Sequence, residues 1–202
     1  FTVAMGIRGD EILTDMYTDP DYFHALMDFI VDATIARIRA WRDYLGLESR
    51  PRQGGFADDA IQMLSTDAYV EYILPSHRRL IDELFGDGPH SMHLCGNVQR
   101  HLPTIRDKLN IDSFDTGFPI DFTALREEIG EDVEISGGVH VDILRSGTPD
   151  EVRAETKRIL ESGIMKGGKF IIKEANNVAP GTPPENFAAM YETVKQYGTY
   201  RT

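Results

Sequence analysis

Residues 133–161 read VEISGGVHVDILRSGTPDEVRAETKRILE, and this stretch indicates how the chain folds. Its first part, residues 133–136, is a short, largely apolar run of the kind that forms a buried strand. Further on, Thr148-Pro149-Asp150-Glu151 places threonine at a helix cap, proline at the first helical position and glutamate three residues after the cap. The stretch therefore predicts a strand that is followed by a helix.

The same order recurs in the second half of the chain. Short runs at residues 91–95, 111–114 and 170–173 each precede a stretch with a helical pattern. Thr182-Pro183-Pro184-Glu185 repeats the helix-start signature and predicts a helix capped by Thr182. Strands that alternate with helices form a parallel sheet, either a closed barrel or a doubly wound open sheet.

The first half of the chain is more helical. A long helix is predicted over residues 19–46, because Pro20 suits a first turn and apolar residues recur at three- and four-residue steps. A short strand over residues 53–57 and a second helix over residues 65–86 follow. Pro75 is expected to kink this second helix, since proline cannot donate the backbone hydrogen bond.

The number of strands bears on the choice between barrel and open sheet. About five strands are predicted, whereas a complete barrel has eight. No Gly-x-Gly-x-x-Gly segment is present, so a dinucleotide-binding open sheet has no positive support. The first residues, 1–5, lack a starting methionine and read as the middle of an element, so we expect the chain to be incomplete at this end.

Composition narrows the classes of function. The chain has 202 residues, of which 41% are hydrophobic and 27% charged, as in ordinary globular proteins. A net charge of -12 disfavours nucleic acids and anionic membranes as partners. We expect a soluble protein, because no apolar run approaches about 20 residues and no signal peptide is evident. Cys95 is the single cysteine, which excludes an intrachain disulfide and favours the cytoplasm.

Three motifs follow one another in barrel order: His93-Leu94-Cys95-Gly96-Asn97, Gly137-Gly138, and the segment APGTPPEN at residues 179–186. Together they resemble the uroporphyrinogen decarboxylase superfamily. That group includes porphyrinogen decarboxylases and zinc-dependent methyltransferases that move methyl groups between corrinoids and thiols. The resemblance runs over almost the whole chain. It implies an α/β fold, a TIM (β/α)8 barrel of which residues 1–202 form a single domain with roughly the last five βα units.

The resemblance also implies a metal site. In the methyltransferase branch, a His-x-Cys pair and a second, distant cysteine bind zinc, and the pair falls here on His93 and Cys95. The place of the second cysteine is taken by Asn176. In the decarboxylase branch a histidine would fall on Asn176, so this position matches neither branch.

His93 and Cys95 also indicate metal binding independently of the resemblance. Side chains two residues apart on a strand share a face, so His93 and Cys95 converge. Zinc accepts nitrogen and sulfur ligands and lowers the pKa of a bound thiol or water. Glu174 is predicted as the third ligand by its chemistry, with Asn176 and His140 as alternatives. The competing interpretation is a buried thiol beside a histidine that bonds to the backbone.

Further polar residues follow the predicted strands. Asp58 and Asp59 come after the strand at residues 53–57, where they could serve as a catalytic acid or base, or cap the next helix. His140 follows Gly137-Gly138 and is a candidate catalytic residue, because glycines let the backbone approach a ligand closely.

Three residues are predicted to contact the substrate. Asp115 follows the strand at residues 111–114, and its alternative role is that of a plain loop aspartate. Asn176 and Asn177 follow the strand at residues 170–173, and their alternative role is a turn with left-handed backbone.

The resemblance leads to a hypothesis of metal-assisted methyl transfer, with zinc as cofactor and a corrinoid, a corrinoid protein or a methylated small molecule as partner. One alternative is a cofactor-free decarboxylase acting on a porphyrinogen or another carboxylate-rich substrate, such as a tetrapyrrole. Another is a catalytically inactive barrel that binds a ligand. A homo-oligomer is also expected, since an open sheet exposes its edge strands.

Overall fold

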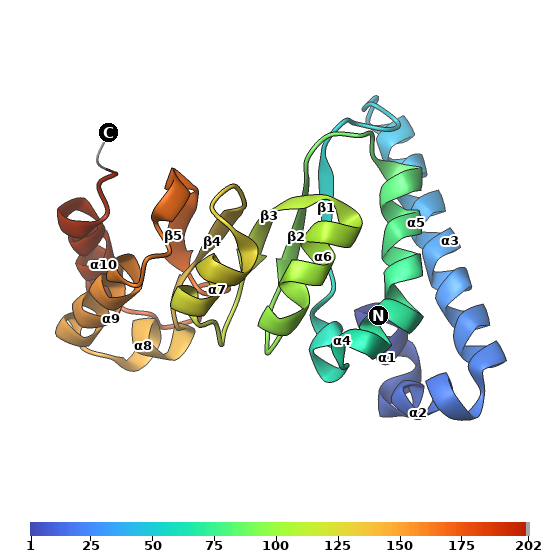
Figure 1. Cartoon of the computed structure of the whole chain (residues 1–202), viewed down its shortest axis with the longest axis horizontal. Coiled ribbons are helices and arrows are strands. Elements are labelled where there is room, and N and C mark those ends of the chain that lie inside the picture. Colours follow the sequence, from blue (N-terminus) through green and yellow to red (C-terminus); the bar gives the residue numbers. More distant parts are fainter. Residues whose placement is uncertain (201–202) are drawn as a thin grey trace. The chain divides into compact units, whose positions relative to one another are not determined.

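The computed structural model describes residues 1–200, which form two compact units (Figure 1). Unit 1 consists of Phe1–Ser91 and Thr104–Ile111, and unit 2 consists of Met92–Pro103 and the described residues from Asp112 onward. Helices and strands alternate through most of the chain, as the sequence predicts. No helix among residues 1–200 is long and apolar enough to cross a bilayer.

The sheet has five strands in chain order, β1-β2-β3-β4-β5. Strands β3, β4 and β5 pair in parallel, with Asp115 beside Ser136 on β4, and Ser136 beside Ile171 on β5. This confirms the prediction of an α/β fold with a parallel sheet. The strands are β1 (Gly54–Ala57), β2 (His90–Leu94), β3 (Ile111–Thr116), β4 (Glu134–Val139) and β5 (Phe170–Glu174).

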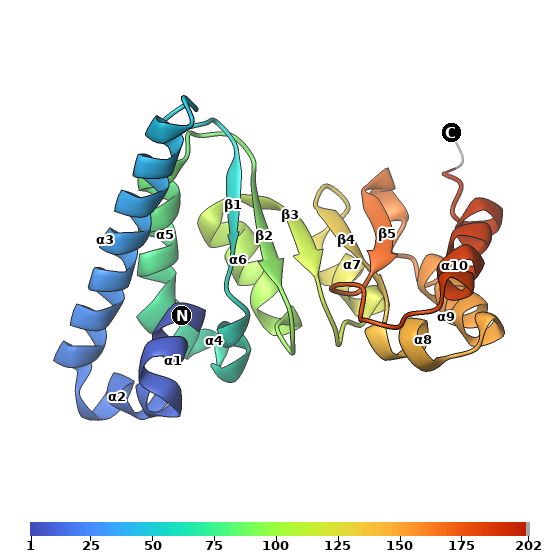
Figure 2. The same cartoon turned by 180° about the vertical axis from the view of Figure 1, so that it is seen from behind.

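Unit 1 is dominated by the long helix α3 (Pro20–Tyr44), which confirms the predicted helix at this place. The Asp19 side chain accepts a hydrogen bond from the backbone nitrogen of Tyr22 and so caps the helix. The helix packs along α5 (Figure 2). Its buried face recurs every four residues, at Phe23, Met27, Val31 and Ile35.

The predicted kink at Pro75 takes the form of a π-helical turn. Helix α4 (Thr66–Ala68), capped by Ser65, leads into the π-helix η3 (Tyr69–Ile73), and α5 (Leu74–Leu84) continues from there. Proline has no N–H to donate to the preceding turn, and the wider turn accommodates it. The remaining elements of this part of the chain are α1 (Thr2–Arg8), η1 (Gly9–Glu11), α2 (Ile12–Thr18) and η2 (Asp59–Met63).

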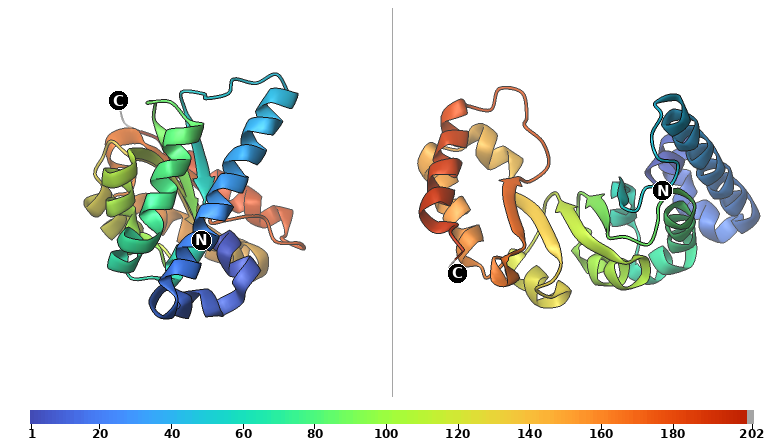
Figure 3. Two further views of the ribbon diagram at one scale, coloured as in Figure 1. Left: turned by 90° about the vertical axis from the view of Figure 1, so that its right-hand side faces the viewer. Right: turned by 90° about the horizontal axis from the view of Figure 1, so that it is seen from above.

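Helices α9 and α10 of unit 2 pack side by side, the orange and red helices of Figure 3. Thr148 and Glu151 form the reciprocal capping box that the sequence predicts. The remaining helices from β2 onward are η4 (Gln99–His101), α6 (Leu102–Leu109), α7 (Phe122–Ile129), α8 (Val141–Ser146), α9 (Pro149–Glu161), η5 (Lys166–Gly168) and α10 (Pro184–Tyr197).

The predicted cap of α10 is wrong by one residue. Pro183, not Thr182, precedes the helix, and it provides no side-chain cap. The Thr182 hydroxyl donates instead to the carbonyl oxygen of Ala179 at 2.7 Å. The Thr182 hydroxyl is therefore used in a hydrogen bond within the turn and does not cap the helix.

One face of the unit 2 sheet lies in the core. The side chains of Phe114, Ile135, Val139 and Phe170 are almost completely buried. Because successive side chains on a strand point to opposite faces, the residues between them point to the other face. Asp115 and Lys173 belong to this second face, and both are only partly buried.

Candidate active site

Polar side chains from three strands meet on the second face of the unit 2 sheet. His93 Nδ1 on β2 lies 2.9 Å from Asp115 Oδ2 on β3. Asp115 Oδ1 lies 2.7 Å from Lys173 Nζ on β5, as an ion pair. We call these three residues the His93–Asp115–Lys173 network. All three side chains are partly exposed, at 28%, 39% and 26%.

Strand register explains how Lys173 reaches Asp115. Asp115 aligns with Ser136 and Ile171, so Lys173, two residues beyond Ile171, lies on the same face as Asp115. Its partner on the intervening strand β4 is Gly138. Glycine has no side chain on that face, so the lysine side chain can cross β4 to the carboxylate.

The hydrogen bond to Asp115 selects one form of the His93 ring. An ionised carboxylate only accepts hydrogen bonds, so Nδ1 of His93 carries the proton. In the neutral ring, Nε2 then holds the lone pair. A histidine whose Nδ1–H is held by a carboxylate is the usual arrangement at metal sites and at catalytic bases.

Cys95 lies just beyond the end of β2, beside the end of β3. The backbone nitrogen of Gly117 donates to Leu94 O at 3.0 Å, and that of Gly96 donates to Phe118 O at 3.1 Å. A Cβ atom on Gly117 would overlap the Cys95 sulfur. The space that the thiol occupies therefore depends on a glycine at position 117.

Zinc fits this site in part. His93 and Cys95 supply the nitrogen and sulfur donors that zinc prefers, and Asp115 already orients the histidine. Across residues 1–200, however, no group of three or more His, Cys, Asp or Glu side chains is placed to hold a metal ion. Glu174 Oε1 lies 3.8 Å from Lys173 Nζ, and strand alternation assigns Glu174 to the opposite face from Lys173. Its role as third ligand stays a prediction.

Asn176 and Asn177 follow β5, and Asn176 is half-buried whereas Asn177 is exposed. The alternative prediction of left-handed backbone at these positions is wrong. Among the non-glycine residues of 1–200, positive φ occurs at Asn110, with φ of 55°. A substrate contact through either asparagine stays a prediction.

His140 caps helix α8, which begins at the next residue, Val141. Its Nδ1 accepts a hydrogen bond from the backbone nitrogen of Asp142 at 3.1 Å. Its ring lies 4.0 Å, centroid to centroid, from the ring of Phe118. The side chain is 35% exposed, which is compatible with the predicted catalytic role without testing it.

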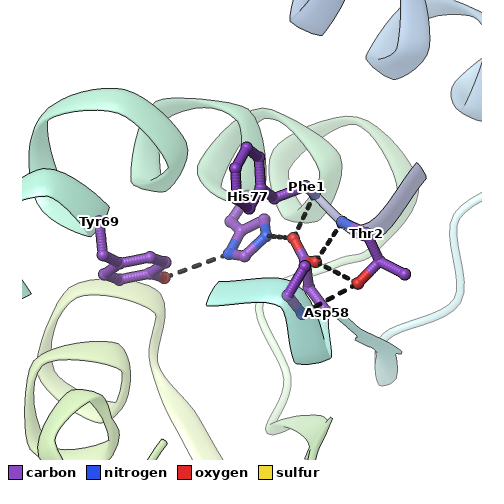
Figure 4. A network of polar contacts seen from close by, with 6 residues as sticks. Phe1, Thr2, Asp58, Tyr69 and His77 are labelled. Atoms are coloured by element: carbon purple, nitrogen blue, oxygen red, sulfur yellow. Dashed lines mark hydrogen bonds and ion pairs between the residues drawn. The ribbon is translucent and has the colours of Figure 1, made fainter. Parts of the chain in front are cut away.

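Asp58 belongs to unit 1 and is the acceptor at the centre of a second network (Figure 4). Its Oδ2 lies 2.8 Å from His77 Nε2 and 2.5 Å from the backbone nitrogen of Phe1. Its Oδ1 accepts from the backbone nitrogen of Thr2 at 2.7 Å and from the Thr2 hydroxyl at 2.8 Å. The Tyr69 hydroxyl lies 3.2 Å from His77 Nδ1. We call this the Asp58–His77–Tyr69 network.

Burial sets the protonation states of this network. Burial raises the pKa of Asp58, but the hydrogen bond from His77 and the neighbouring Phe1 nitrogen outweigh it, so the pKa lies far below its ordinary value. Complete burial lowers the pKa of His77 despite the opposing effect of Asp58. Burial also raises the pKa of Tyr69. At neutral pH, a neutral His77 thus donates from Nε2 to Asp58 and accepts at Nδ1 from Tyr69.

Asp58 therefore acts as a cap, although not for the helix that follows it. Its side chain makes no cap hydrogen bond to η2, but it accepts from the first backbone amide of α1. Asp59 is the first residue of η2 and is half-buried. A catalytic role for either aspartate stays a prediction.

Lys173 and His77 are polar residues to which the sequence assigned no role. Alternation along β5 carries a signal for Lys173, because it places the lysine on the face opposite the buried Phe170. The signal for His77 is its position on the buried face of α5, with Ile81 and Leu84.

Comparison with known proteins identifies relatives along nearly the whole chain. The family model for uroporphyrinogen decarboxylase (URO-D) matches residues 1–197. A methylated-thiol–coenzyme M methyltransferase of Methanosarcina mazei is 31% identical over 97% of this chain and 51% of its own length. A uroporphyrinogen decarboxylase of Dechloromonas aromatica is 25% identical over 90% of this chain and 50% of its own length.

A solved structure agrees with the fold. A methyltransferase from Methanosarcina mazei superposes with a TM-score of 0.74 at 21% identity, covering 98% of this chain and 56% of the other. The chain spans about half the length of the curated relatives it matches. The parallel sheet with alternating helices is thus consistent with part of a TIM barrel.

Proposed function

Because the chain belongs to the uroporphyrinogen decarboxylase family, we propose that it carries part of the active site of an enzyme that transfers a methyl group to or from a thiol. The 31% identity with a methylated-thiol–coenzyme M methyltransferase supports this reaction over others in the family. The proposed donor classes are a methylated corrinoid, free or protein-bound, and a methylated small molecule. The observation that carries the proposal is the 2.9 Å contact between His93 Nδ1 and Asp115 beside Cys95.

The residues that would hold zinc are His93 and Cys95, with Glu174 as the proposed third ligand. Bound zinc would lower the pKa of a thiol and make it nucleophilic at neutral pH. Asp115 keeps the proton of His93 on Nδ1 and directs the lone pair to Nε2. Gly117 leaves the space that the Cys95 sulfur occupies.

Other residues would contact the substrate in this proposal. The adjacent rings of Phe118 and His140 offer an apolar surface with a polar edge. Asn176 provides an amide where the family's further metal-binding residue is expected. Asp59 is kept as a candidate acid or base group on the strength of its position after β1, whereas both oxygens of Asp58 already contact residues of unit 1.

The test is zinc content together with methyl transfer from methylcobalamin to a thiol in the purified protein. We expect about one zinc per chain in the parent protein and a loss of most of that zinc in Cys95→Ser and His93→Ala. Asp142→Asn is the matched control, since Asp142 is exposed at the start of α8. A protein with no stoichiometric zinc whose methyl transfer is unaffected by Cys95→Ser would contradict the proposal.

A second candidate function is decarboxylation of a carboxylate-rich substrate such as a porphyrinogen. This reaction needs cations to hold the acid groups, and Lys173 supplies one on the face that carries His93. The 25% identity with a uroporphyrinogen decarboxylase favours the same candidate. Release of carbon dioxide from uroporphyrinogen would support it. Binding of a tetrapyrrole or corrinoid without turnover would instead indicate an inactive ligand-binding barrel.

A further inference from the structure

Lys173 is placed to hold the Asp115 carboxylate from the side opposite His93. The two oxygens of Asp115 are used separately, Oδ2 by His93 and Oδ1 by Lys173. Among residues 1–200, Oδ1 is a buried atom that accepts no hydrogen bond of ordinary geometry. The ammonium group 2.7 Å away is therefore what compensates its charge.

Two-sided contact restricts the carboxylate more than either contact alone. A carboxylate held at one oxygen can still rotate about its side-chain bonds and carry the partner ring with it. With Lys173 on Oδ1, such a rotation would separate an ion pair inside a partly buried site. Lys173, two strands away, thus restrains the carboxylate that contacts His93.

We propose that Lys173 is a positioning residue: through Asp115 it fixes the His93 ring in the form with the proton on Nδ1 and the lone pair on Nε2. The consequence for metal binding rests on the proposed function, whereas the effect on the ring does not. Gly138, the register partner of Lys173 on β4, has no side chain to obstruct the contact between Lys173 and Asp115.

A different role for Lys173 makes the opposite prediction. If the ammonium acted mainly as a cation that repels a metal ion, its removal would tighten zinc binding. If it acts by orienting His93 through Asp115, its removal weakens zinc binding, as loss of an outer partner of a ligand does. The sign of the change in zinc affinity therefore separates the two roles.

The first measurement is the tautomer of His93, read from the ¹⁵N chemical shifts of the imidazole in metal-free protein. We expect the Nδ1–H form alone in the parent protein, a mixture of both forms in Lys173→Met, and the single form again in Lys173→Arg. Lys169→Met is the matched control, because it removes a lysine just before the other end of β5, where Nζ contacts Asp132 O.

The second measurement is zinc affinity by competition with a chromophoric chelator. We expect Lys173→Met to bind zinc about tenfold more weakly, with Lys173→Arg and Lys169→Met within about twofold of the parent. An unchanged tautomer in Lys173→Met, or tighter zinc binding, would overturn the inference. If the tautomer changes in Lys173→Met but the parent protein binds no zinc, the positioning role is supported and the proposed function is contradicted.

Discussion

Two histidine–carboxylate pairs in this molecule have nearly the same contact distance but differ in burial. His77 and Asp58 approach to 2.8 Å with side chains 3% and 4% exposed, whereas His93 and Asp115 approach to 2.9 Å with side chains 28% and 39% exposed. Both oxygens of Asp58 are satisfied by residues of its own unit, and both ring nitrogens of His77 are used. Asp115 is satisfied in part by an ion pair with a lysine.

The difference separates a structural pair from a candidate chemical one. A buried pair with every donor and acceptor used fixes the backbone around it, but offers no atom to a substrate. A pair at a partly exposed strand end holds its histidine in one form within reach of solvent. Distance alone would not distinguish the two pairs, whereas the exposed fractions of their side chains do.

The largest expected effect is on stability and lies in the buried pair. Asp58→Asn removes a buried charge that accepts from His77, Phe1 and Thr2, so we expect unfolding in urea to require about 3 kcal/mol less free energy. Asp115→Asn, the same change in the exposed pair, is expected to cost less than about 1 kcal/mol. Equal losses in the two variants would show that burial does not separate the two pairs in their contribution to stability.

The second largest expected effect is on the rate of methyl transfer and concerns Gly117, beside Cys95. A methyl group at position 117 would overlap the Cys95 sulfur and displace it, so Gly117→Ala is expected to slow methyl transfer by about 100-fold. Gly6→Ala is the control, because a Cβ there meets no atom within 4 Å. Activity and urea unfolding are measured on the same samples. Loss of activity that only follows loss of stability would mean that Gly117 serves the fold alone.

A smaller effect is expected at the outer end of the buried network. Tyr69→Phe removes the hydroxyl that donates to His77 Nδ1 and leaves a buried acceptor unsatisfied, which costs about 1–2 kcal/mol in urea unfolding. The matched change Tyr191→Phe, at an exposed ring on α10, should leave stability unchanged. A neutral result at Tyr69 would indicate that His77 finds another donor, such as a buried water.

The smallest expected effect is on how the stability of the protein changes with pH. His77 and Asp58 both have a pKa below the ordinary value in the folded protein, so the unfolded chain binds protons first as pH falls. The stability that each contributes is complete above its ordinary pKa, about 6.5 for His77 and 3.9 for Asp58, and is lost below it. Urea unfolding at pH 7.5, 6 and 5 should show a decline that His77→Phe reduces. A parent protein equally stable at the three values would contradict this.

The sequence predicted what local patterns determine. Pro20 in the first turn of α3 and the Thr148–Glu151 box both act within one helical turn, so these two helix starts were readable from spacing alone. The strands followed from short apolar runs, and their parallel pairing followed from the helices between them.

Contacts across strands and between distant segments were not predictable in the same way. Lys173 meets Asp115 only because β3, β4 and β5 align in one register and β4 has a glycine between them. His77 meets Asp58 because α5 packs along β1, at a separation of 19 residues. His93 and Cys95 were predicted from the resemblance to a family. Lys173 and Gly117, which contact or make room for this site, were identified only from the packing of the strands.

The cap that Asp58 provides to α1 has a consequence for the order in which this part of the molecule opens. Helix α1 has seven residues, fewer than an isolated helix needs to persist in water. Its first amide is held by a carboxylate 56 residues away in the sequence. Exchange of the α1 amide hydrogens with solvent deuterium should therefore require the end of β1 to open as well, so that the two segments exchange as one cooperative group.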